Sequence, residues 1–344
     1  MHDIACVIHL HSTYSDGTGT VPEIMKAARR AEVDVVLLTD HDNLKAKQNG
    51  EEGWHDGALL LVGEEVSPRG GNHYLAFGLN RHVRRRGRSI AEICQVVRER
   101  GGFGFAAHPW SKGSERFKRD GMPFDDPDLA DGVELWSFAT DSAESLESIP
   151  AVLKFLAAPG RRLTHPPERN LREWERMCAQ RRVPAIGGLD AHQFGKRIGP
   201  VVPIRLMRYE RSFRFIRTHV LCSEPLSGEL EPDRTAVFDA LREGRSYIAV
   251  DHFAPARGFD FWGEGPDGEL PMGAEAPAGR YRLRAVLPEP ARLRLLQDGR
   301  EVAVAEASEL AHDADEPGVF RIEARIERDG RERTWILSNP LYLR

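Results

Sequence analysis

The sequence has few of the residues that stabilise small secreted proteins or membrane proteins. Only 4 of its 344 residues are cysteine, and they are scattered singly without a Cys-x-x-Cys pair. This argues against a disulfide framework and against a thiolate zinc site. No apolar stretch approaches the roughly 20 residues that a membrane span requires. The net charge of −5 combines both signs, which argues against nucleic acid as a partner.

The length and composition are those of a protein with a large core. The 344 residues exceed the usual size of one domain, and 41% of them are hydrophobic, so we expect two domains. A histidine motif already begins at residue 9, which leaves no room for a cleavable leader. We therefore expect a cytoplasmic protein without a membrane anchor. No pattern in the sequence specifies an oligomeric state.

Histidine and carboxylate residues follow several strand-like apolar runs. His9 and His11 come after the run 4–8, and Asp190 and His192 come after the run 186–189. Residues two apart on a strand leave it on the same face. A lone histidine at a strand end is more often packed or solvent-facing than a ligand. Two such pairs are suited to holding a metal ion.

Further residues of the same kinds follow or open other apolar runs. Glu65 follows the run 58–63, His73 opens the run 73–78, and His108 closes the run 104–108. Imidazole and carboxylate ligands together favour Mn²⁺, Fe²⁺ or Zn²⁺ over Mg²⁺ or Ca²⁺. With two residues from polar motifs added, the candidate metal ligands are His9, His11, Asp16, His41, Glu65, His73, His108, Asp190 and His192.

The ordered series of motifs resembles the polymerase and histidinol phosphatase (PHP) family of metal-dependent phosphoesterases. The matching pieces are HLHS, SDG, LTDHD, GEEVS, HYLAFG, AAHP and GLDAH, which together span residues 4–222. The resemblance implies two or three divalent metal ions. It assigns the first ion to His9, His11, Glu65 and Asp190, the second to Glu65, His73 and His108, and the third to Asp16, His41 and His192.

Strand-like and helix-like runs alternate along the first two thirds of the chain. This alternation, with ligands at the carboxyl ends of strands, is typical of a TIM-type barrel or of an open doubly wound sheet. The family resemblance implies a distorted (β/α)7 barrel. We expect strands over 4–10, 33–39, 132–137, 183–189 and 218–223, and helices beginning near Thr20, over about 145–156, over 171–180 and over about 234–242.

The hydrophobic period changes to two from about residue 256. Apolar residues alternate with polar ones over 281–287 and 320–326, and Asp298-Gly299 and Asp329-Gly330 supply hairpin turns. We therefore expect a metallohydrolase barrel over 1–255 and a small antiparallel β-sandwich domain over 256–344. This combination looks like the branch of the family that includes carbaryl hydrolases.

Three functions are compatible with these residues. The preferred one is a phosphoesterase of a small phosphate monoester or diester, in which the metal ions activate a hydroxide. The second is a hydrolase of carboxyl or carbamate esters that uses the same site. The third is a metal-binding sensing or interaction protein.

Catalytic side chains other than the metal ligands are harder to predict from the sequence. His192 and His41 are the best candidates for giving the leaving group its proton, although both are also candidate ligands. Arg197 follows His192 by five residues and is a candidate clamp for a phosphate oxygen. A surface arginine in a loop is an equally good interpretation of Arg197.

Overall fold

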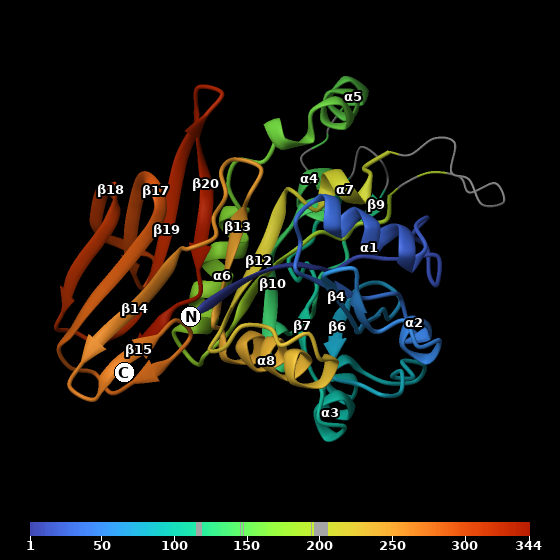
Figure 1. Ribbon diagram of the computed structural model, residues 1–344, viewed down its shortest axis with the longest axis horizontal. Coiled ribbons are helices and arrows are strands. Elements are labelled where there is room, and N and C mark those ends of the chain that lie inside the picture. The colour runs from blue at the N-terminus through green and yellow to red at the C-terminus, as the bar shows by residue number, and fades with distance from the viewer. Residues whose placement is uncertain (115–118, 145, 147, 194, 196–205) are drawn as a thin grey trace.

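The structure is a computed structural model that describes residues 1–114, 119–144, 146, 148–193, 195 and 206–344. It confirms the expected mixed α/β class, with helices on one side of the picture and long strands on the other (Figure 1). The helices are α1 (Val21–Arg30), α2 (Lys45–Gln48), α3 (Ile90–Glu99), α4 (Phe138–Glu144), α5 (Ile149–Ala157), α6 (Glu168–Cys178), α7 (Tyr209–Ser212) and α8 (Leu230–Glu243), with two 3-10 turns at Pro127–Leu129 and Pro159–Arg161.

The described strands form one large sheet, one sheet of five strands and one small hairpin. In the N-terminal part of the large sheet, the order is β13 (Ser246–Val250), β12 (Ile216–Cys222), β1 (His2–Ile8), β2 (Val35–Leu38), β4 (Ala58–Val62) and β3 (Gly53–His55). β1, β2 and β4 are parallel. Every residue of β2 and β4 is buried, as expected for parallel strands that are covered on both faces.

The second sheet brings the later candidate ligands next to the first sheet. Its order is β11 (Ala185–Gly188), β10 (Gly132–Ser137), β7 (Phe103–Ala106), β6 (Tyr74–Phe77) and β5 (Glu64–Val66), and the separate hairpin is β8 (Gly113–Ser114) with β9 (Arg119–Asp120). Both edge strands of the second sheet are joined to the first sheet by single bridges just beyond the ends of β1 and β2, Leu10 with Ala191 and His41 with Glu65. In the described part of the chain, no continuous ladder closes these strands into the expected seven-stranded barrel.

Unlike the strands of a regular β/α barrel, these strands are not all parallel. β12 is antiparallel to β1, and β6 is antiparallel to both β5 and β7. The connection from β5 to β6 contains only residues 67–73, which is too short for a helical crossover between parallel strands. The helix expected over about 145–156 corresponds to α5, which begins later, at Ile149, and ends at Ala157. A separate helix, α4, has already ended at Glu144.

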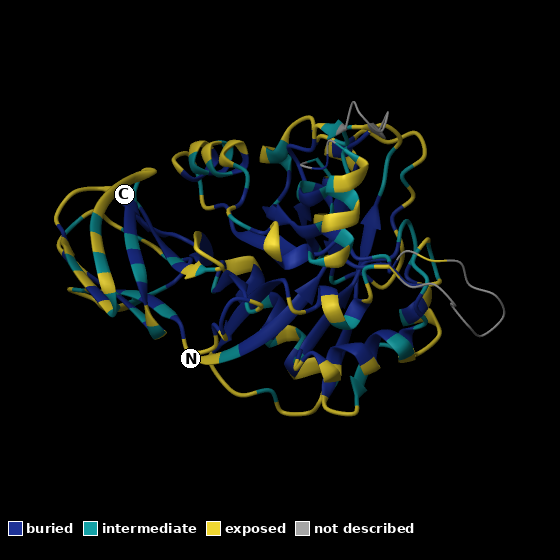
Figure 2. Cartoon of the chain, turned by 90° about the horizontal axis from the view of Figure 1, so that it is seen from above, coloured by how far each residue is buried: buried dark blue, intermediate teal, exposed yellow. Residues whose placement is uncertain are grey.

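The strands of the C-terminal part are antiparallel, as the period of two predicted, except that β16 pairs with β21 in parallel. They are β14 (Asp260–Gly265), β15 (Gly268–Pro271), β16 (Glu275–Ala276), β17 (Tyr281–Gln297), β18 (Arg300–Ala314), β19 (Gly318–Arg328), β20 (Arg331–Ser338) and β21 (Leu341–Leu343). Figure 2 shows buried and exposed residues alternating along these strands. These strands do not form the separate β-sandwich that was expected, because β20 pairs with β13 and so extends the large sheet.

Local sequence signals explain the ends of several helices. Thr20 and Glu23 form a capping box at the start of α1, and Gly244 ends α8 in the left-handed conformation at φ 71°. The cysteines are all buried and free. Among the described helices, none is long and apolar enough to cross a membrane.

Candidate metal centre

The nine candidate ligands predicted from the sequence lie together where the two sheets meet. His9 and His11 follow β1, and Asp190 and His192 follow β11. These two segments are held side by side, because the backbone N–H of His11 donates to the carbonyl of Ala191 at 2.9 Å and that of Ala191 donates to His9 at 3.2 Å. The pairing places two ligand-bearing strand ends against each other.

Glu65 is the centre of the cluster. Its carboxylate is 1% exposed and has imidazole nitrogens from several strand ends at N–O distances of 2.7 to 3.6 Å. Burial raises the pKa of Glu65, but the charge of His9, the nearby ring of His108 and the hydrogen bond with His73 hold it well below its ordinary value. The five imidazoles around this carboxylate are those of His9, His11, His41, His73 and His108.

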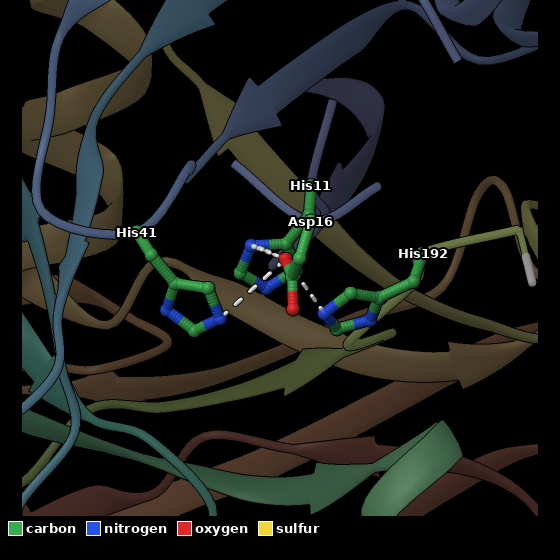
Figure 3. A group of neighbouring side chains, drawn as sticks. All are labelled: His11, Asp16, His41 and His192. Carbon is green, nitrogen blue, oxygen red and sulfur yellow. Dashed lines mark ion pairs between the residues drawn. The ribbon is translucent and has the colours of Figure 1, made fainter. Parts of the chain in front are cut away.

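Asp16 is the centre of a second, more open group (Figure 3). One of its carboxylate oxygens lies 3.2 Å from His192 Nε2, 3.6 Å from His41 Nε2 and 3.8 Å from His11 Nδ1. The His11 ring stacks against both of the other rings, with centroids 4.4 Å from His41 and 4.1 Å from His192. The side chain of Asp16 is 58% exposed, so this end of the cluster faces solvent.

The donor set fits divalent cations. Among the described residues, His9 Nε2, His11 Nε2 and Glu65 Oε2 are buried and make no hydrogen bond, although the two nitrogens lie 3.4 and 3.3 Å from the oxygen. Leaving buried polar atoms unsatisfied is costly, and a cation among these atoms would satisfy them together. Three groups could each hold an ion: His9, His11 and Asp190; His9, Glu65 and His108; and His11, Asp16, His41 and His192.

The backbone at the strand ends is strained. His9, His108 and Asp190 have φ values of 64°, 32° and 47°, in the left-handed region that residues other than glycine rarely adopt. Such conformations cost about 1–3 kcal/mol each and collect at functional sites. The fold therefore holds these three side chains in place at a cost in stability.

Glu134 is a buried residue that the sequence analysis missed. It lies in β10 with no exposure, where its Oε1 is 2.9 Å from His9 Nδ1 and its Oε2 accepts the backbone N–H of His108 at 2.8 Å. Gly188 makes this approach possible, because a Cβ there would lie 1.8 Å from Glu134 Oε1. The available signal was a glutamate inside the otherwise apolar run 132–136.

Other polar residues hold the candidate ligands in orientation. Thr140 donates to Asp190 Oδ2 at 2.8 Å, and Ser67 Oγ lies 2.7 Å from His41 Nδ1. Hydrogen bonds of this kind fix a ligand's position and tautomer. Asp40 instead accepts the N–H and hydroxyl of Ser12, at 2.7 and 2.6 Å, so it supports the loop after β1.

Glu64 and Glu65 are adjacent in the sequence but point to different surroundings. Glu64 accepts the backbone N–H of Val83 at 2.7 Å, and burial raises its pKa to about 8. The alternation of side chains along β5 explains why only Glu65 joins the cluster. Arg197, the predicted phosphate clamp, lies outside the described residues.

Comparison with known proteins confirms the family resemblance. Residues 8–96 match the family model of the PHP domain. An uncharacterized protein of Methanocaldococcus jannaschii is 27% identical over 142 residues, and the match covers 38% of this chain and 80% of that protein.

Two solved structures show a distant likeness. A two-domain protein from Bacteroides vulgatus, which contains a predicted PHP-like metal-dependent phosphoesterase, is 15% identical with a TM-score of 0.46, covering 98% of this chain and 95% of its own. A protein from Bifidobacterium adolescentis, predicted to be a metal-dependent phosphoesterase, is 18% identical with a TM-score of 0.36, covering 60% and 94%. Because these likenesses are so distant, function is inferred from the side chains of the site.

Proposed function

We propose that this protein, which contains a PHP domain, is a metal-dependent phosphoesterase that hydrolyses a small phosphate monoester or diester. The observation that carries the proposal is the buried Glu65 carboxylate with five imidazoles around it. Two or three divalent ions, of Mn, Fe or Zn, would be held by the nine candidate ligands. Such ions lower the pKa of a bound water toward 7 and neutralise charge that develops on phosphate oxygens.

The chain's own residues would bind the ions and move one proton. In the reaction, the oxygen of water bonds to phosphorus and gives up one proton, the bond from phosphorus to the ester oxygen breaks, and the leaving alkoxide takes up a proton to become the alcohol. Of the two predicted donors, His192 lines a pocket beside the cluster that His41 does not line. With two ions bound and the group around Asp16 free of metal, we therefore favour His192 as the residue that gives the proton to the leaving alkoxide.

The same cluster would also serve hydrolysis at carbon, as in carboxyl or carbamate esters. The observation that favours this second function is the lining of the pocket beside His192, which contains no lysine or arginine among its described residues. A carbamate has no phosphate charge to be matched by such cations. A metal-binding sensing protein is the remaining alternative, in which the same ligands hold ions without turnover.

The pair Glu65→Gln and Glu64→Gln tests the proposal. Both substitutions remove one buried carboxylate from β5, but only Glu65 faces the imidazoles. We expect purified wild type and Glu64→Gln to hold two or more divalent ions per chain by elemental analysis, and to hydrolyse p-nitrophenyl phosphate or bis-p-nitrophenyl phosphate. Glu65→Gln should lose bound metal and turnover, because the carboxylate between the imidazoles becomes a neutral amide.

Each result selects one function. Turnover of 1-naphthyl methylcarbamate without turnover of either phosphate would select the hydrolase of carbon esters. Metal binding without turnover of any of these substrates would favour the sensing protein. Equal metal content in the two variants would contradict the role of Glu65.

A further inference from the structure

An apolar pocket adjoins the open end of the metal cluster. Its volume is about 470 Å³, and Asp16, Asp190 and His192 form one of its walls. The remaining lining residues come from α4, α5 and the segments beside them: Ala139, Ala143, Leu146, Val152, Phe155, Leu156 and Met207. One side of the pocket thus belongs to the cluster, while all the other described lining residues are apolar.

The apolar wall is held in place by packing behind it. Phe155 is buried, and its ring lies 6.0 Å from Phe138, which stacks at 4.6 Å on Phe215. α5, the helix at the top of Figure 1, is capped by Ser148, whose hydroxyl accepts the N–H of Ala151. Packing and capping therefore fix the shape of this wall, as is typical of largely pre-formed small-molecule sites.

We propose that this pocket binds an apolar organic group of the substrate, such as an aryl or branched alkyl group. The inference rests on the proposed function for the identity of the reacting ester. His192 and Asp190 belong to the metal cluster and also line the pocket. An ester that reacts at the cluster would therefore extend its organic part into the pocket. The volume lies within the roughly 300–1,000 Å³ of typical ligand sites.

The lining disfavours polar alcohols such as sugars and nucleosides. Their hydroxyl groups would lie against alanine, leucine, valine and phenylalanine side chains, where the loss of hydrogen bonds to water is not compensated. An aryl or branched alkyl group gains free energy there by leaving water. The pocket thus selects esters of apolar alcohols over esters of polar ones.

Two neighbouring residues of α5 provide a matched test. Val152 lines the pocket, whereas Leu153 is 62% exposed on the outside of the same helix. We would measure the affinity of wild type, Val152→Asp and Leu153→Asp for 1-naphthol by fluorescence titration. Far-UV circular dichroism would first show that all three proteins are folded. Val152→Asp should weaken binding about tenfold or more, because it places a carboxylate in the apolar wall. Leu153→Asp should bind like wild type.

Turnover supplies a second readout on the same proteins. We expect the ratio of kcat/KM for 1-naphthyl phosphate to that for phenyl phosphate to fall in Val152→Asp only. Absence of 1-naphthol binding to wild type, or equal binding by both variants, would overturn the inference while phosphate turnover could still establish the proposed function. Binding of 1-naphthol that depends on Val152, without turnover of either phosphate, would support the pocket and refute the phosphoesterase.

Discussion

His219 is expected to make the protein less stable as the pH rises from 6.5 to 9. The ring is 1% exposed, and its Nδ1 lies 2.7 Å from Asp3 and its Nε2 3.3 Å from Asp251. Burial lowers the pKa of His219, but hydrogen bonds to Asp251 and Asp3 outweigh it and raise the pKa to about 9. The imidazolium is therefore favoured in the folded protein.

The magnitude follows from the difference between the two states. The folded pKa of about 9 exceeds the ordinary 6.5 by an amount that corresponds to about 3 kcal/mol. Because the folded pKa is the higher one, this stabilisation is fully present below pH 6.5 and is lost as the pH passes through 9. The pKa of Asp251 is lowered to about 2 despite its burial, because of His219 and Arg217, so its contribution disappears only in acid.

The assay compares wild type with His219→Gln by urea unfolding at several pH values between 6 and 10, with EDTA in every sample. The glutamine removes the titrating group, and the packing it loses is lost equally at every pH. The difference in free energy of unfolding should shrink by about 3 kcal/mol from pH 6 to pH 10. Parallel pH profiles for the two proteins would refute the reasoning.

Two further substitutions test local features. Glu134→Gln keeps the shape of the side chain but removes the charge beside His9, so metal affinity measured by competition with a chelator should fall about 10- to 100-fold; unchanged affinity would show that Glu134 only fills space. Ser89→Ala removes the hydroxyl that accepts the N–H of Glu92 at the start of α3. The free energy of unfolding, measured in urea, should fall by about 1 kcal/mol. A loss below a few tenths of that would mean that water satisfies the Glu92 N–H as well as the serine hydroxyl does.

The strand ends that carry the candidate ligands were predictable because their signal is local. His9 and Asp190 each follow a short apolar run, and the spacing of two to the next histidine appears directly in the sequence. That these side chains share one cluster depended on the family motifs. Their pairing is made by tertiary contacts such as the bridge between Leu10 and Ala191.

Features that depend on pairing between distant strands were not predictable. Examples are the antiparallel direction of β6 and the pairing of β20 with β13. Tertiary structure determines which strands pair, and the hydrophobic period of a single strand does not specify its partner. Glu134 was missed for the same reason, since its partner His9 is 125 residues away. The division of the chain at residue 255 remains a prediction.

The place of β1 in the large sheet has a consequence for biosynthesis. β1 leads into the first two candidate ligands, and its residues His2 to Cys6 pair with β12, where His2 lies opposite Cys222. The ribosome must therefore synthesise the chain as far as Cys222 before β1 can pair with both of its neighbouring strands, β2 and β12. Contacts of such long sequence separation form slowly. The nascent chain thus exposes its first histidines well before Asp190 exists, and the complete set of candidate metal ligands assembles only once His192 has been made.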